Sequence, residues 1–198
     1  MSVELIVLVV VVVLVAALAA ALLGAYLTAH RLDRLHIRTD LARAALAGAL
    51  ERRHAVAAAV ARDLADRDPP GAYRLFHALA RARAHPPDAI AGPDPAPQPP
   101  RRRTDRADDD EAGENAELAE NTLGMMLAAL DVEALPVDLA SELEDATDRV
   151  SMARRFYNDA VRDTRGLREQ TAVRALRLAG RAPMPDYVEL VDAPPPRA

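Results

Sequence analysis

Residues 139–167 read LASELEDATDRVSMARRFYNDAVRDTRGL, and this stretch decides the fold. Apolar or small residues recur in it alternately four and three positions apart. This heptad spacing places them along one seam of an α-helix, and such a seam requires a partner helix. The seam consists of Leu139, Leu143, Ala146, Val150, Ala153, Tyr157, Ala160, Thr164 and Leu167. The charged residues fall on the opposite, solvated face. We therefore predict a long amphipathic helix from about residue 137 to residue 178.

A second decisive stretch, residues 5–29, reads LIVLVVVVVLVAALAAALLGAYLTA and contains no charged residue. As a helix it is about 37 Å long, which exceeds a hydrocarbon core of about 30 Å. Val-rich runs favour strands in water, but in lipid the backbone must satisfy its own hydrogen bonds, so a helix is expected. Ala20 and Gly24 form a small-x-x-x-small pair that suits close helix pairing, although the abundance of Ala explains it equally well.

The flanks of this stretch predict its orientation. A cleaved signal peptide is the alternative, but it requires a basic N-terminal region and an apolar core of about 7–15 residues. The N-terminal flank is Met-Ser-Val-Glu, whereas Arg31, Arg34, Arg38 and Arg43 follow the stretch. The positive-inside rule places that basic side in the cytoplasm. We predict a single span of the plasma membrane with the N-terminus outside.

The remainder of the chain has helical patterning and no strand signals. No Pro precedes Pro69, so the span is expected to continue as a helix to about residue 67, with a break near Gly24 or Thr28 as the alternative. Shorter helices are predicted at 72–84 and 116–131, and Glu133 to Pro136 form a turn. Pro-rich and charge-rich sequence between 86 and 115 predicts disorder.

These elements predict an all-α protein, in which a transmembrane helix precedes an antiparallel bundle of about four helices. The predicted regions are a transmembrane anchor (1–29), the first and second bundle helices (30–85), a disordered linker (86–115), the third and fourth bundle helices (116–178) and an irregular tail (179–198).

Residues 153–163, ARRFYNDAVRD, resemble the signature of the LemA family, A-R-x-x-Y-N-x-x-V on the last long helix. The motif residues are Arg154, Tyr157, Asn158 and Val161. The turn at 133–136 and the Leu-Glu-Arg-Arg run at 50–53 are similar to family features in the same order. The chain departs from the family at Thr164-Arg165 and at His30-Arg31, where relatives carry Tyr-Asn pairs, and in its Pro-rich insertion. The resemblance implies a divergent, membrane-anchored helical bundle and no defined activity.

The motif favours a structural role for its central pair. Tyr157 lies on the seam, so we expect a buried ring whose hydroxyl needs a partner. We interpret Tyr157 and Asn158 as a packing and hydrogen-bonding device that fixes helix register. Contact with a ligand is the alternative interpretation.

Composition excludes several kinds of chemistry. The chain has no Cys, and all 25 of its basic residues other than His are Arg, which excludes disulfides, thiolate chemistry and lysine Schiff bases. The net charge of −5 argues against nucleic acid. Glu51-x-x-His54 has the spacing of a di-iron ligand pair, but its only near match, Asp33-x-x-His36, is on the same helix. We interpret the Glu51 to His54 segment as a solvated helix face and expect no metal, cofactor or catalytic residue.

The sequence thus predicts a cytoplasmic bundle that acts as an interaction or scaffolding module at the bilayer, with protein partners that it does not identify. Self-association, through the span or the fourth-helix seam, is the main alternative and would give a homo-oligomer. A hydrolase or metal enzyme is a further alternative, because sequence alone does not reveal spatial constellations.

Overall fold

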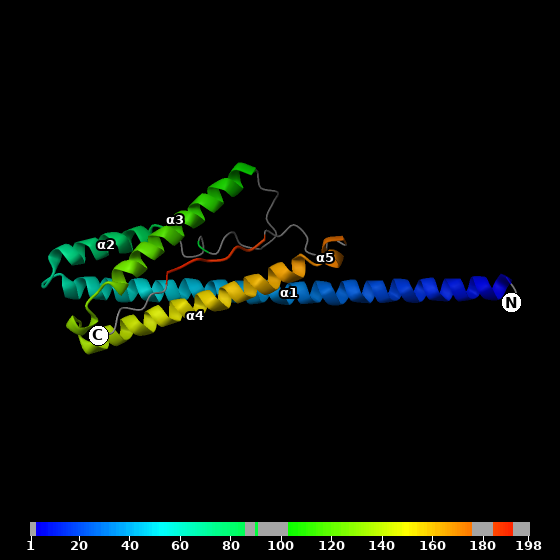
Figure 1. Cartoon of the computed structure of the whole chain (residues 1–198), viewed down its shortest axis with the longest axis horizontal. Helices are drawn as coiled ribbons and strands as arrows, with labels where there is room; N and C mark the ends of the chain where they lie inside the picture. The colour runs from blue at the N-terminus through cyan, green and yellow to red at the C-terminus, as the bar shows by residue number, and fades with distance from the viewer. Residues whose placement is uncertain (1–2, 86–89, 91–102, 176–183, 192–198) are drawn as a thin grey trace.

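The computed structural model describes residues 3–85, 90, 103–175 and 184–191. All regular secondary structure within them is helical and none is a strand, so the predicted all-α class is confirmed. Helix α1 spans Val3–Leu64, and α4 spans Val137–Arg168 and lies alongside its second half. Helices α2 (Pro69–Arg83) and α3 (Arg103–Ala128) lie on the other side of α1 from α4 (Figure 1).

Helix α1 is one uninterrupted helix of 62 residues. Its first half projects away from the bundle, and none of the side chains in its most apolar 18-residue window is buried. Its second half supplies buried residues from Leu32 to Ala61. Among the described residues, α1 is the one helix that is long and apolar enough to cross a membrane. The apolar helix therefore continues into the bundle as expected, without a break at Gly24 or Thr28.

The seam of α4 is the centre of the fold. Eight of its nine predicted residues are buried, and Leu139 packs partly buried against the core. The two helices run antiparallel, as Arg52 pairs with Glu142 near one end and Arg38 with Asp163 near the other. The partner that the heptad pattern requires is therefore α1 of the same chain.

In the turn from α1 to α2, the side chain of Asp68 lies close to the backbone of Gly71. Asp68 caps α2, and its Oδ1 accepts a hydrogen bond from the backbone N–H of Gly71 at 3.0 Å. A Cβ at residue 71 would lie 1.9 Å from Oδ2 of Asp68, so a larger residue there would force the Asp68 carboxylate to shift. Pro69 and Pro70 occupy the first helical positions, where a missing N–H costs nothing.

Two predicted boundaries are wrong. Helix α3 begins at Arg103, so residues 103–115, predicted as part of a disordered linker, are helical. No Pro follows Pro100 in this segment, so nothing in its sequence prevents a helix. The rest of that predicted linker lies outside the described residues, except Ile90, which is buried in the core.

The second wrong boundary is the end of the fourth helix, predicted near residue 178. Helix α4 ends at Arg168, and a short helix, α5 (Thr171–Ala175), follows a turn. The turn allows both Leu167 and Val173 to pack on Leu32 of α1. A straight helix would carry the chain past that contact, so packing on α1 overrides the continuing helical pattern. The predicted irregular tail is described only at 184–191, which is not helical.

Replacement of a seam residue provides a direct test of this architecture. We expect Leu143→Ala to lower the free energy of unfolding by about 2–5 kcal/mol, because it leaves a cavity in the core. Met152→Ala on the exposed face of the same helix should change it by less than about 0.5 kcal/mol. Urea unfolding followed by circular dichroism in detergent measures both, and equal effects would contradict the packing of α4 on α1.

Candidate functional site

The four motif residues of α4 lie at the centre of the bundle but have different environments. Tyr157 and Val161 are fully buried in the core cluster that also contains Leu46 and Leu50 of α1. Arg154 is half-buried, and so is Asn158, which lies one position around the helix from the seam. Asn158 therefore faces the space between α4 and α3.

That space is filled by residues 184–191, which we call the C-terminal strap. The strap is extended and runs between α3 and the α1–α4 pair (Figure 1). Asn158 holds it with both ends of its amide. The backbone N–H of Val188 donates to Oδ1 of Asn158 at 2.9 Å, and Nδ2 of Asn158 donates to the carbonyl oxygen of Val188 at 3.0 Å. The side chain thus pairs with the strap as a neighbouring β-strand would.

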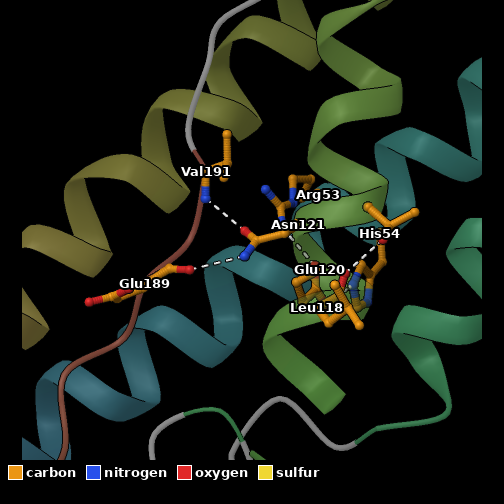
Figure 2. A network of polar contacts seen from close by, with 8 residues as sticks. Arg53, His54, Leu118, Glu120, Asn121, Glu189 and Val191 are labelled. Carbon is orange, nitrogen blue, oxygen red and sulfur yellow. Dashed lines mark hydrogen bonds and ion pairs between the residues drawn. The ribbon is translucent and has the colours of Figure 1, made fainter. Parts of the chain in front are cut away.

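A second asparagine holds the strap from α3. Nδ2 of Asn121 donates to the carbonyl oxygen of Glu189 at 3.0 Å, and the N–H of Val191 donates to Oδ1 of Asn121 at 2.7 Å (Figure 2). Alternate residues of an extended chain present their backbone groups to opposite sides. Residue 188 therefore pairs with α4, whereas residues 189 and 191 pair with α3.

Side chains of the strap complete the core. Val188 and Leu190 are buried in the same cluster as Tyr157. The hydroxyl of Tyr157 donates to the carbonyl oxygen of Asp186 at 3.1 Å, and burial raises the pKa of that hydroxyl. Arg165 donates to the carboxylate of Asp186 and lies over the ring of Tyr187. The motif pair thus anchors the strap, in addition to packing α4 on α1.

The sequence analysis did not identify Asn121 or the role of the strap. Asn121 has no motif around it, and an asparagine within a helix ordinarily points to solvent. The available signal was the alternation in Tyr187-Val188-Glu189-Leu190, which is typical of an extended segment with one buried side.

A cluster of buried charges lies beside the strap, between α1 and α3. Glu120 of α3 accepts a hydrogen bond from Arg53 at 2.6 Å through Oε2 and contacts Nε2 of His54 at 2.6 Å through Oε1 (Figure 2). All three side chains are at most 5% exposed. Because an ionised carboxylate only accepts hydrogen bonds, Nε2 of His54 carries a proton in this arrangement.

The environment of Glu120 favours its ionised form. Burial by itself raises the pKa of Glu120, but the hydrogen bond from His54 and the charge of Arg53 outweigh it, so the pKa lies below its ordinary value of 4.5. A lowered pKa in the folded state means that the ionised carboxylate stabilises the fold above pH 4.5. This contribution is lost as the pH falls through the lowered pKa.

The position of His54 corrects one prediction. The sequence pattern indicates a solvated face from Glu51 to His54, yet only Glu51 and Arg52 are exposed, while Arg53 and His54 are buried. The burial follows from Glu120, which a single helix pattern does not reveal. Within the described parts of the chain, no group of three or more His, Asp or Glu side chains is placed to hold a metal ion.

The charge cluster and Asn121 give α3 polar contacts both to α1 and to the strap. Glu120 faces α1, and its neighbour Asn121 faces the strap. Nε of Arg53 is buried with no hydrogen-bond partner in the described structure. The buried charges join α1 to α3, and the amide of Asn121 joins α3 to the strap, so these contacts hold three segments of the chain together.

Comparisons with protein-family models, with curated proteins and with solved structures find no match to this chain.

We expect loss of Glu120 to be costly, because it leaves the charge of Arg53 buried and unpaired. Glu120→Leu should lower the free energy of unfolding by about 3–5 kcal/mol, whereas Arg53→Met combined with Glu120→Leu should recover most of the loss. The double variant should also lose less stability on acidification than the parent. Chemical unfolding at pH 7 and pH 4 measures these effects, and a single-variant cost below about 1 kcal/mol would show that water reaches the cluster.

Removal of the Asn158 amide should release the strap without unfolding the helices. Asn158→Ala deletes two hydrogen bonds, each worth about 1 kcal/mol, and so should speed amide exchange at Val188 by about 30-fold. Asn115→Ala, at an exposed asparagine of α3, is the matched control and should leave the exchange rate unchanged. Hydrogen exchange read by mass spectrometry distinguishes the two variants. Equal exchange rates at Val188 in both would show that Asn158 does not hold the strap.

Proposed function

We propose that this chain is a single-pass membrane protein whose helical bundle lies in the cytoplasm and acts as an interaction module. The observation that carries the proposal is the composition of α1. No residue in its most apolar 18-residue window is buried, and its other half is the central helix of the core. Exposed apolar surface of this extent is stable in lipid and unstable in water.

The continuity of α1 also favours an anchor over a cleaved leader. The apolar run passes into the core helix with no interruption. The basic residues that follow the run support the cytoplasmic side for the bundle. The plasma membrane, with the N-terminus outside, is the proposed location.

An open groove gives the proposed module a surface for a protein partner. The groove lies between α1 and α4, has a volume of about 530 Å³, and is lined in part by Gly48, Arg52, Met152 and Phe156. Met152 and Phe156 are more than half exposed. Partially exposed apolar side chains next to an arginine are typical of protein-binding surfaces. Tethering at the membrane raises the effective concentration of any partner that binds there.

Self-association is the second candidate, and the structure narrows the surfaces available for it. The α4 seam is filled by α1 of the same chain, so it is not free to pair with a second copy. The size of the protein in detergent distinguishes the candidates, because self-association requires a discrete oligomer and a scaffold does not.

We further propose that the chain is a divergent LemA-like protein and is not an enzyme. The motif of α4 supports the resemblance.

Topology is the first test of the proposal. The chain has no Cys, so Ser2→Cys and Ala198→Cys each provide a unique label. In intact cells, a membrane-impermeant maleimide should label the N-terminal cysteine alone, and both cysteines after permeabilisation. Labelling of the C-terminal cysteine alone would place the bundle outside the cell and replace the cytoplasmic module with a role in the envelope.

A further inference from the structure

The bundle begins immediately at the end of the apolar run. The run ends at Ala29, and Leu32, the first buried residue of α1, packs against Leu167 of α4 and Val173 of α5. Three residues of helix correspond to about 4.5 Å. The headgroup layer on each side of a bilayer is about 5–8 Å thick. If the apolar run fills the hydrocarbon core, the corner between α4 and α5 lies at the level of the headgroups.

Arginines from separate parts of the chain gather at this corner, and we call them the membrane-proximal arginines. They are Arg31 and Arg34 of α1, Arg168 at the end of α4, and Arg174 of α5. Two carboxylates, those of Asp33 and Glu169, lie in the same segments. Arg31, Arg34 and Arg174 are exposed and have no ion-pair partner within the part of the chain that the structure describes.

The charge of α4 is polarised in the same direction. The half of α4 that lies far from the span, residues 137–148, contains five acidic residues and no basic one. The half that approaches the span, residues 149–168, contains six arginines and two aspartates. Such polarity also suits the helix dipole of α4. That explanation does not extend to Arg31 and Arg34, which are in the middle of α1, so a shared anionic neighbour accounts for more of the pattern.

We propose that the membrane-proximal arginines form a binding site for the headgroups of anionic phospholipids. The site rests on the proposed membrane anchorage and deepens it, because the lipid contacts would include α4 and α5 as well as the flank of the span. Guanidinium groups bind phosphate through paired hydrogen bonds and remain charged at every physiological pH. An arginine close to an anionic surface strengthens binding by about fivefold. The bundle is thereby held upright on the bilayer at a fixed rotation.

The chain contains no Trp, which permits a direct test on the full-length protein in bilayers. Gln170→Trp places one fluorophore at the exposed turn before α5, and Val137→Trp places one at the opposite end of α4 as the control. The probes are phosphatidylglycerol and phosphatidylcholine that carry the same nitroxide close to the headgroup, each at the same low mole fraction in phosphatidylcholine. We expect labelled phosphatidylglycerol to quench the fluorophore at residue 170 more strongly than labelled phosphatidylcholine does. Neither lipid should quench the fluorophore at residue 137.

Substitution of the arginines tests the specific claim. Arg168→Gln with Arg174→Gln should reduce the preference for phosphatidylglycerol at least about fivefold while Arg31 and Arg34 are retained. Arg174→Gln alone should reduce this preference in part, and it provides the test if the double variant fails to fold. Arg62→Gln with Arg81→Gln, at arginines of α1 and α2 far from the span, is the charge-matched control and should have no effect.

The outcomes separate this site from the anchor itself. Equal quenching of the fluorophore at residue 170 by the two labelled lipids would show a membrane-anchored bundle without an anionic-lipid site. The preference for phosphatidylglycerol could instead disappear only with Arg31→Gln and Arg34→Gln. That result would confine the site to the flank of the span and overturn the role of α4 and α5. Neither result depends on which side of a cellular membrane the bundle occupies, so cysteine labelling remains an independent test of topology.

Discussion

The antiparallel contact between α1 and α4 is the constraint on which the structure depends. Both helices have an apolar stripe that would be exposed in isolation, and together they bury it from Leu32 and Leu167 at one end to Val60 and Leu143 at the other. Burial of this kind is the main favourable term in folding. Because α1 is also the only helix among the described residues that is long and apolar enough to cross a membrane, the same contact joins the bundle to that apolar segment.

Hydrogen bonds to the strap fill the space that helix packing leaves between α3 and α4. Helix α3 packs mainly on α2 and stands away from α4 (Figure 1). The strap occupies the space between α3 and α4, and asparagines from both helices form hydrogen bonds with its backbone groups. A buried backbone without partners would be costly, and a side-chain amide offers the donor and acceptor that a neighbouring strand would otherwise provide. Asn158 therefore does more than fix the register of the helices, because its amide also pairs with the backbone of the strap.

The sequence predicts those features that arise from local periodicity. The apolar run at 5–29 and the seam of α4 are long, regular patterns, and the structure shows the first as a continuous exposed helix and the second as a buried face. Features that depend on a distant residue were missed or misplaced. His54 is buried because Glu120 lies opposite, α4 stops at Arg168 because Val173 returns to Leu32, and the helical segment at 103–115 has an acidic composition that resembles disorder. No window of sequence contains both partners of either contact.

In the proposed membrane-anchored arrangement, the continuity of α1 sets the distance of each surface from the bilayer. The helix has no break between Ala29 and the residues that line the α1–α4 groove. Residues 45–52 therefore lie about 24–35 Å beyond the end of the apolar run along the helix axis. A partner in that groove would be held close to the membrane surface, within reach of small domains and of the cytoplasmic ends of other membrane proteins. A hinge between span and bundle would remove this restriction, and the uninterrupted α1 does not provide one.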